Sequence, residues 1–121
     1  MKRFRAILLA AGLGTRLRPL TNNTPKCLVK VGGKPLLGHW IEYLDALNCE
    51  SLLINTHYLS DQVENYISQI SDLKMNIKLI YEEELLGTAG TLIANKSFFE
   101  DYTGILIHAD NYSEANLNDF L

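Results

Sequence analysis

The chain has no long apolar run and no excess of basic residues, and each absence excludes a class of protein. No apolar stretch approaches the about 18 residues of a membrane-spanning helix, and the N-terminus has no small-residue cleavage site, so we expect neither a membrane span nor a signal peptide. The formal net charge is −3 at pH 7, which disfavours a protein that coats nucleic acid or a membrane surface. There is no internal repeat and no low-complexity tract.

Cysteines are also few, and their spacing excludes the common metal sites. Cys27 and Cys49 lack the spacing of metal ligands, so we expect free thiols and a reducing, cytoplasmic location. The length of 121 residues is near the usual size of one domain and is enough to bury a core. We therefore treat residues 1–121 as one domain.

Short apolar runs alternate with helical patterns along the chain. Runs rich in Ile and Leu predict buried parallel strands at residues 4–10, 51–55, 77–81 and 104–108. Apolar residues at helical spacing predict helices at 35–47, from Ser60 as N-cap to about 70, at 88–96, and from Asn116. This order predicts an α/β fold, a Rossmann-like, doubly wound and mainly parallel sheet with flanking helices. In such sheets ligands bind beyond the carboxyl ends of the strands.

The first predicted strand runs into a glycine loop that is followed by basic side chains. Gly12 and Gly14 permit close approach of the backbone, so several N–H groups can converge on phosphate oxygens. Arg16 and Arg18 can add forked donors, and Lys26 a compact positive charge. The pattern predicts a polyphosphate site. The alternative is an ordinary strand-to-helix turn with incidental basic residues.

Two better-known phosphate loops do not fit this segment. A dinucleotide fingerprint would need a third glycine where Leu17 stands, and the acidic residue expected about 20 positions later is missing. A Walker A loop would need Ser or Thr after Gly33-Lys34, where Pro35 stands. Neither of these two motifs therefore fits the segment.

The segment resembles the signature of the sugar-nucleotide pyrophosphorylases, nucleotidyltransferases that join a nucleoside triphosphate to a sugar 1-phosphate. The matching segments are Leu9-Ala10-Ala11-Gly12-Leu13-Gly14-Thr15-Arg16-Leu17-Arg18-Pro19-Leu20-Thr21, Thr24-Pro25-Lys26 and Gly33-Lys34-Pro35-Leu36-Leu37. The resemblance implies that the nucleotide is bound by Leu9, Ala10, Ala11, Gly12, Gly14, Thr15, Arg16, Glu82, Gly87 and Thr88. It also implies that Arg16 lies on the departing β- and γ-phosphates, and that Lys26 lies near the α-phosphate or the incoming sugar phosphate.

A second segment, residues 81–91, matches the family's Leu-Gly-Thr-Ala-Gly run. On its own this segment could be a solvated acidic loop, with Gly87-Thr88 as a capped turn into a helix. In the resembling enzymes the loop holds the base, and the residue that reads it stands five positions before the glycine, here Glu82. A carboxylate only accepts hydrogen bonds, which suits the two adjacent donors of guanine, whereas the glutamine of uridylyl and thymidylyl transferases suits uracil or thymine. We therefore expect GTP, and the segment is most similar to mannose-1-phosphate guanylyltransferases.

The third segment is the predicted strand that ends before Asp110. Nucleotidyl transfer needs a divalent cation on the phosphate oxygens, and Mg²⁺ takes one or two protein carboxylates. We expect Asp110 to bind Mg²⁺ and to form the catalytic set with Arg16 and Lys26. Ala109 stands where the family usually has glycine, an exchange that the fold should tolerate. The alternative is that Asp110 is a turn or capping residue.

The resemblance covers the nucleotide-binding half of the family and leaves other functions open. The sugar-binding half of the family lies beyond Asp110, so we expect a fragment, a truncated product or one piece of a split protein. Such a chain should self-associate through exposed apolar edges and turn over poorly alone. The alternatives are a uridylyl- or thymidylyltransferase for glucose 1-phosphate, a guanylyltransferase for heptose 1-phosphate, and a non-catalytic nucleotide-binding module.

Overall fold

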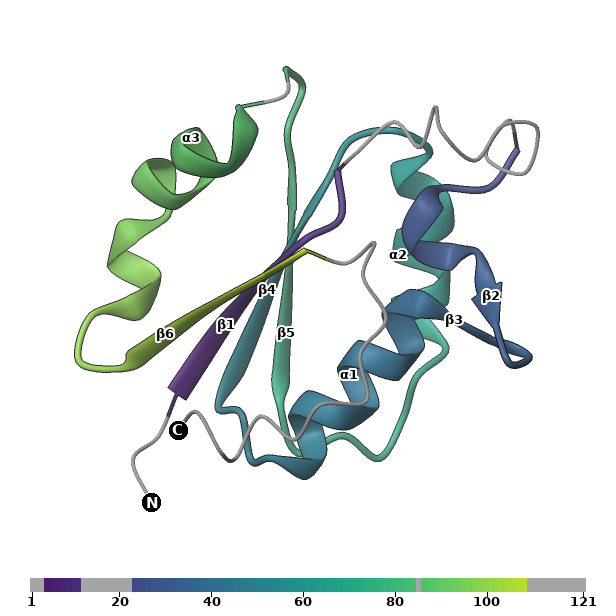
Figure 1. The fold of residues 1–121 in the computed structure, drawn as a ribbon, viewed down its shortest axis with the longest axis horizontal. Helices are drawn as coiled ribbons and strands as arrows, with labels where there is room; N and C mark the ends of the chain where they lie inside the picture. Colours follow the sequence, from purple (N-terminus) through teal and green to yellow (C-terminus); the bar gives the residue numbers. More distant parts are fainter. Residues whose placement is uncertain (1–3, 12–22, 85, 109–121) are drawn as a thin grey trace.

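A four-stranded parallel sheet forms the centre of the molecule (Figure 1). The computed structural model describes residues 4–11, 23–84 and 86–108. The strands are β1 (Phe4–Leu9), β4 (Ser51–Thr56), β5 (Asn76–Tyr81) and β6 (Thr103–His108). Their order in the sheet is β5-β4-β1-β6, with every pair parallel. The four predicted strands are therefore confirmed, within one or two residues at each end.

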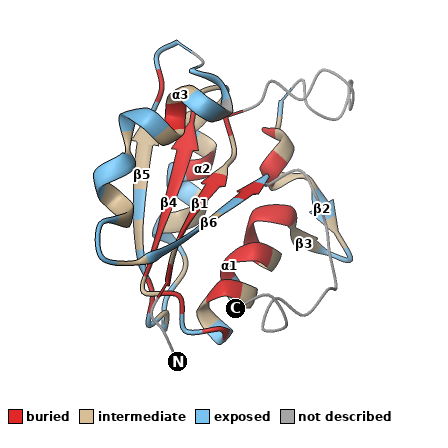
Figure 2. Ribbon diagram, turned by 60° about the vertical axis from the view of Figure 1, so that its left-hand side comes forward, coloured by how far each residue is buried: buried red, intermediate tan, exposed pale blue. Residues whose placement is uncertain are grey.

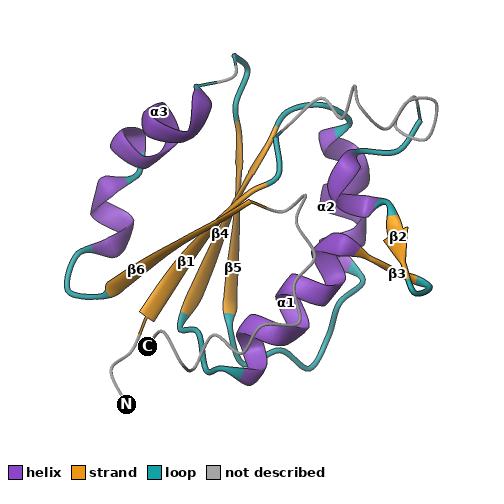
Figure 3. Ribbon diagram, viewed as in Figure 1, coloured by secondary structure: helices purple, strands orange, loops and turns teal. Residues whose placement is uncertain are grey.

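Helices cover both sides of this sheet, as the prediction of a doubly wound fold required. Helices α1 (Leu36–Ala46) and α2 (Ser60–Ser68) lie on one side, and α3 (Gly87–Ala94) with the 3₁₀ helix η4 (Lys96–Phe99) lies on the other (Figure 3). In the described part of the chain, no helix is long and apolar enough to cross a membrane. The helix expected from Asn116 lies outside the described residues.

The start of α2 differs from the prediction that Ser60 is its N-cap. Ser60 is the first helical residue, and Leu59 occupies the cap position with a left-handed φ of 54°. This conformation turns the chain so that the Leu59 carbonyl accepts the Gln62 N–H at 3.0 Å. The backbone closes the first turn without a side-chain cap, which is why the side-chain rule placed the helix start one residue late.

Three short elements between β1 and α1 were not predicted. The 3₁₀ helix η3 (Lys26–Leu28) precedes a two-stranded antiparallel hairpin of β2 (Lys30–Val31) and β3 (Lys34–Pro35). Gly32 and Gly33 form its turn with φ of 62° and 81°, the pair of positive angles that a tight hairpin favours. Elements of two residues have too little periodicity to be recognised from sequence.

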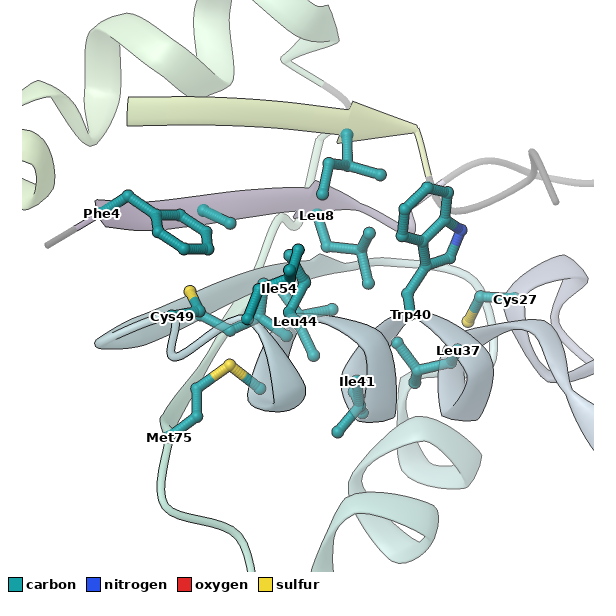
Figure 4. Close-up of a cluster of buried hydrophobic side chains, with 14 of the residues drawn as sticks. Phe4, Leu8, Cys27, Leu37, Trp40, Ile41, Leu44, Cys49, Ile54 and Met75 are labelled. Carbon is teal, nitrogen blue, oxygen red and sulfur yellow. The ribbon is translucent and has the colours of Figure 1, made fainter. Parts of the chain in front are cut away.

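The core lies between α1, α2 and one face of the sheet (Figure 4). Helix α1 contributes Leu37, Trp40, Ile41, Leu44 and its C-cap Leu47 to the cluster. Cys27 and Cys49 are free thiols buried in the same cluster, as expected. Burial raises the pKa of Cys27 to about 12 and that of Cys49 to about 11, so both remain protonated at neutral pH.

The four strands are not equally buried, although all were predicted to be. Every residue of β4 is buried, while the outer strands β5 and β6 consist mostly of exposed and partly buried residues (Figure 2). In β6 only Ile107 is buried. Among the described strands β5 and β6 lie at the sheet edges, so side chains on one face of each keep contact with water.

An arginine ties the outer strand β6 to β1 at the amino end of the sheet. Arg5 Nε donates to Glu50 Oε1 at 2.6 Å, and Arg5 Nη1 donates to the Phe98 carbonyl at 2.9 Å. The guanidinium carbon lies 3.9 Å from the centroid of the Tyr102 ring. Because Phe98 and Tyr102 precede β6, these contacts help to hold β6 beside β1.

We predict that Ile54→Ala lowers the free energy of unfolding by about 2–5 kcal/mol, because it leaves a cavity at the centre of the sheet. Ile54 is 0% exposed, whereas Ile93 on α3 is 70% exposed and serves as the matched position. Ile93→Ala should change the same quantity by less than about 0.5 kcal/mol. Urea unfolding followed by circular dichroism measures both, and equal effects would contradict the assigned core.

Candidate functional site

The order of the strands creates a switch point beside β1. The chain runs outward from β1 to β4 and β5, then returns so that β6 pairs with the other side of β1. Leu9, the last residue of β1, is in register with Asn55 on one side and with His108 on the other. In parallel sheets, ligands bind at such a reversal, beyond the carboxyl ends of the strands. Leu9 is the last residue of β1, and the other predicted site residues follow a strand of the sheet in the sequence or stand between β1 and α1.

The backbone that leads into the glycine loop is held by a side chain from β4. Asn55, 4% exposed, accepts the Ala10 N–H on Oδ1 at 2.6 Å. Ala11 is also buried, and Leu9 is partly buried. Because Asn55 takes the Ala10 N–H, this amide is not available to a phosphate, and Ala10 could contribute to binding only through its other atoms. Of the predicted loop residues, Gly12, Gly14, Thr15 and Arg16 lie outside the described residues.

Lys26 begins η3 and is partly buried. Its neighbour Cys27 is packed in the core, which anchors this single turn of helix against the body of the protein. Pro25 precedes it in an extended conformation, with φ of −63° and ψ of 149°. The Thr-Pro-Lys segment is thus held by packing rather than by a side-chain cap.

Glu82 is a buried carboxylate directly after β5. Glu82 is 5% exposed, while Glu83 and Glu84 beside it are exposed. The alternative interpretation of this segment as a solvated acidic loop is therefore wrong for Glu82. Its Oε2 accepts the Thr91 hydroxyl at 2.6 Å, and its Oε1 receives the Leu86 N–H at 3.5 Å. A charged group that leaves water needs such donors.

The main chain of Glu82 is bonded to the end of β4. The Glu82 N–H donates to the Thr56 carbonyl at 2.7 Å. His57 Nδ1 lies 2.7 Å from the Glu82 carbonyl, so Nδ1 carries the proton in this contact. The His57 ring also stacks on Tyr81, with centroids 6.3 Å apart and an interplanar angle of 22°. Residues from β4 and β5 therefore determine where the Glu82 backbone lies.

Helix α3 begins at Gly87, one residue before its predicted start at Thr88. Gly87 is the first residue of the helix with a φ of 74°, a conformation that favours glycine. Leu86 occupies the N-cap and makes no side-chain capping bond. The backbone of Thr88 lies in the first turn of α3, and its side chain lies outside the described residues.

The predicted metal ligand, Asp110, also lies outside the described residues. Within residues 4–11, 23–84 and 86–108, no group of three or more His, Cys, Asp and Glu side chains could hold a metal ion. In the sequence, Asp110 follows the end of β6 by two positions.

Comparison with known proteins places this arrangement in a family. Residues 5–121 match the nucleotidyl transferase family, which covers all the segments described above. The chain belongs to this family. Its Rossmann-like sheet is shared by the structure of HddC from Yersinia pseudotuberculosis complexed with GMP-PN, with a TM-score of 0.83 and 29% identity over 97% of this chain and 52% of that one.

Curated relatives of this chain differ in the nucleotide that their names specify. The chain is 43% identical over 95 residues to the catalytic subunit beta of mannose-1-phosphate guanylyltransferase from Drosophila pseudoobscura pseudoobscura, a match that covers 77% of this chain and 25% of that protein. It is 52% identical over 62 residues to N-acetylmuramate alpha-1-phosphate uridylyltransferase from Caulobacter vibrioides, covering 51% of this chain and 26% of that protein. The matches thus span about a quarter of the length of these two relatives.

Three residues around the candidate site were not predicted as site residues. They are Asn55, His57 and Thr91, and only Thr91 lay within a predicted motif, the segment of residues 81–91. Asn55 follows four apolar or small residues in a strand, and this change to a polar residue at the carboxyl end was the available signal. Thr91 has no such signal, because its nine-residue separation from Glu82 closes only when α3 folds back.

We predict that Asn55→Ala lowers the free energy of unfolding by about 1–3 kcal/mol and weakens triphosphate binding, because the buried Ala10 N–H loses its acceptor. Asn65→Ala on the exposed side of α2 is the control. Calorimetric titration and urea unfolding measure the two effects, and an unchanged unfolding energy in Asn55→Ala would contradict the assigned role.

Proposed function

We propose that this chain forms the nucleotide-binding half of an enzyme that transfers a nucleoside monophosphate from a triphosphate to a sugar 1-phosphate. GTP is the favoured donor and mannose 1-phosphate the favoured acceptor. The observation that carries the proposal is the switch point: the glycine loop follows β1, Asp110 follows β6, and these strands are neighbours. A polyphosphate bound there would meet the loop amides and the metal ligand together.

The chemistry needs no protein nucleophile. An oxygen of the sugar 1-phosphate attacks the α-phosphorus of the triphosphate in line, and a new phosphorus–oxygen bond forms. The bond between the α-phosphorus and the bridging oxygen to the β-phosphorus breaks, and pyrophosphate leaves. The attacking phosphate is already anionic near pH 7, so no general base is required. The protein's part is positioning and charge neutralisation by the loop amides, Arg16 and Lys26.

Asp110 is the residue proposed to hold Mg²⁺. A single carboxylate fits this ion, which keeps several waters and takes its other ligands from substrate phosphates. When bound, the ion would neutralise phosphate charge during transfer. No second carboxylate is needed among the described residues, because triphosphate oxygens can complete the coordination.

Glu82 supports guanine as the base. The Glu82 carboxylate is buried. The oxygens of a carboxylate only accept hydrogen bonds, and guanine presents two donors side by side, a ring N–H and an exocyclic amine. The likeness to a guanylyltransferase over 95 residues and to the GMP-PN complex of HddC agrees with this assignment. The match to a uridylyltransferase favours a second candidate, a uridylyl transferase with the same fold and a different base contact.

Pyrophosphate release decides between the candidates. The full product of the gene is assayed with each of GTP, UTP, dTTP and CTP against mannose, glucose and N-acetylmuramate 1-phosphates. Fastest turnover with GTP supports the proposal, and fastest turnover with UTP supports the second candidate. Triphosphate binding without pyrophosphate release from any pair would indicate a non-catalytic nucleotide-binding module.

We predict that Glu82→Gln reduces the preference for GTP over UTP by about 10- to 100-fold, because a mispaired polar edge costs on the order of 1–3 kcal/mol. Glu83→Gln makes the same change at an exposed neighbour and should leave the preference as it is. Calorimetric titration with each triphosphate in the presence of Mg²⁺ measures it. An equal preference in wild type and Glu82→Gln would exclude Glu82 as the base contact.

We predict that Arg16→Ala and Lys26→Ala each lower kcat by about 100- to 1000-fold, because they remove charge from the phosphates in the transition state. Lys30→Ala, at an exposed position of the hairpin, is the matched control.

Asp110→Asn should raise the Mg²⁺ concentration needed for half-maximal rate, while Asp101→Asn at an exposed turn should not. A Mg²⁺ dependence unaltered by Asp110→Asn would favour the capping role for that residue.

A further inference from the structure

We propose that Thr91 and His57 are positioning residues that hold the Glu82 carboxylate in one orientation before a nucleotide binds, and that this orientation sets the base preference. The inference rests on the proposed function, because it assigns these residues to the reading of a base. Neither residue needs to touch the nucleotide. Each acts through Glu82, one on its side chain and one on its main chain.

Thr91 holds the carboxylate itself. It is 0% exposed, and its hydroxyl donates to Glu82 Oε2 at 2.6 Å, a short contact of the kind made to charged acceptors. The Leu86 N–H approaches the other oxygen at 3.5 Å. A carboxylate can accept about four hydrogen bonds, so each oxygen keeps acceptor capacity for a base.

This contact matters because the side chain alone does not determine where those remaining acceptors point. The terminal torsion of glutamate is broad, with no sharp staggered wells, so an unrestrained carboxylate would rotate. The Thr91 hydroxyl fixes one oxygen and therefore the plane of the whole group. Two adjacent acceptors held in advance can receive two adjacent donors without an ordering cost at the moment of binding.

His57 holds the backbone of the same residue. Its Nδ1–H donates to the Glu82 carbonyl at 2.7 Å, while the Glu82 N–H donates to the Thr56 carbonyl at 2.7 Å. The imidazole ring of His57 also lies near the Tyr81 ring, at an interplanar angle of 22°. Glu82 is thus held from two directions, by the end of β4 and by the second turn of α3.

The test compares Thr91→Val, which removes the hydroxyl and keeps the shape, with Thr91→Ser, which keeps the hydroxyl. In the full product of the gene, Thr91→Val should reduce the GTP-over-UTP preference in kcat/KM by about 10-fold or more, mainly through KM for GTP, and Thr91→Ser should retain most of it. Thr103→Val, at an exposed position of β6, is the matched control. His57→Phe keeps an aromatic ring against Tyr81 and should reduce the preference in the same direction. Equal losses for all triphosphates in Thr91→Val would mean a merely structural role and overturn the proposal.

A double-mutant cycle tests whether Thr91 acts through Glu82. In a Glu82→Ala background, Thr91→Val should change the base preference by less than about 2-fold, because the group that it orients is gone. An effect as large as in the wild-type background would overturn the proposal.

Hydrogen exchange without nucleotide separates this inference from the proposed function. The Leu86 amide should exchange faster in Thr91→Val than in wild type, and Thr91→Ser should resemble wild type, because Oε1 moves when Oε2 is released. If the exchange rate of the Leu86 amide were unchanged in Thr91→Val, the proposal that Thr91 holds the Glu82 carboxylate would be overturned, even in an active enzyme. A wild-type protein that releases no pyrophosphate with any triphosphate would overturn the proposed function, while the exchange result would still decide whether Thr91 holds Glu82.

Discussion

The parallel pairing of β1 with both β4 and β6 is the constraint on which the rest of the structure depends. Because both neighbours run in the same direction as β1, every connection must cross from one end of the sheet to the other, and helices make those crossings. The loops that remain at the carboxyl ends then gather at one edge. Ile7 and Leu8, which face opposite sides of β1, are both 0% exposed. Both faces of this strand are therefore covered by other parts of the protein.

The candidate site shows how a buried charge can serve stability and recognition together. A carboxylate that leaves water is tolerated only with donors around it, and Glu82 has them from Thr91 and Leu86. The same donors restrict its orientation, and in the proposed function this orientation suits a base with two adjacent N–H groups. Asn55 also has two roles at the start of the glycine loop. Its amide oxygen accepts the hydrogen bond of the Ala10 N–H, and this contact holds the backbone at the switch point.

The long elements and the order of the site loops could be predicted, because apolar periodicity over five or more residues is a strong signal. The hairpin of Lys30–Val31 and Lys34–Pro35 could not, since two-residue strands have no periodicity. The cap at Leu59 was missed because a backbone conformation replaced the side chain that the rule looks for. The burial of β5 and β6 was overestimated, because an apolar run does not reveal whether its strand lies at the centre or the edge. The roles expected of Arg16 and Asp110 remain predictions.

The sequence by itself determined the α/β class, the glycine loop after the first strand and the position of Glu82 before the Gly-Thr pair, because these depend on local pattern and on motif spacing. Only the tertiary structure decided the strand order, and with it the switch point between β1 and β6. It also decided that Glu82 is buried against Thr91 and His57 and that the Ala10 amide is taken by Asn55. These contacts join residues 9 to 45 positions apart, from different elements of the fold, and such distances close only when the strands pair and the helices pack.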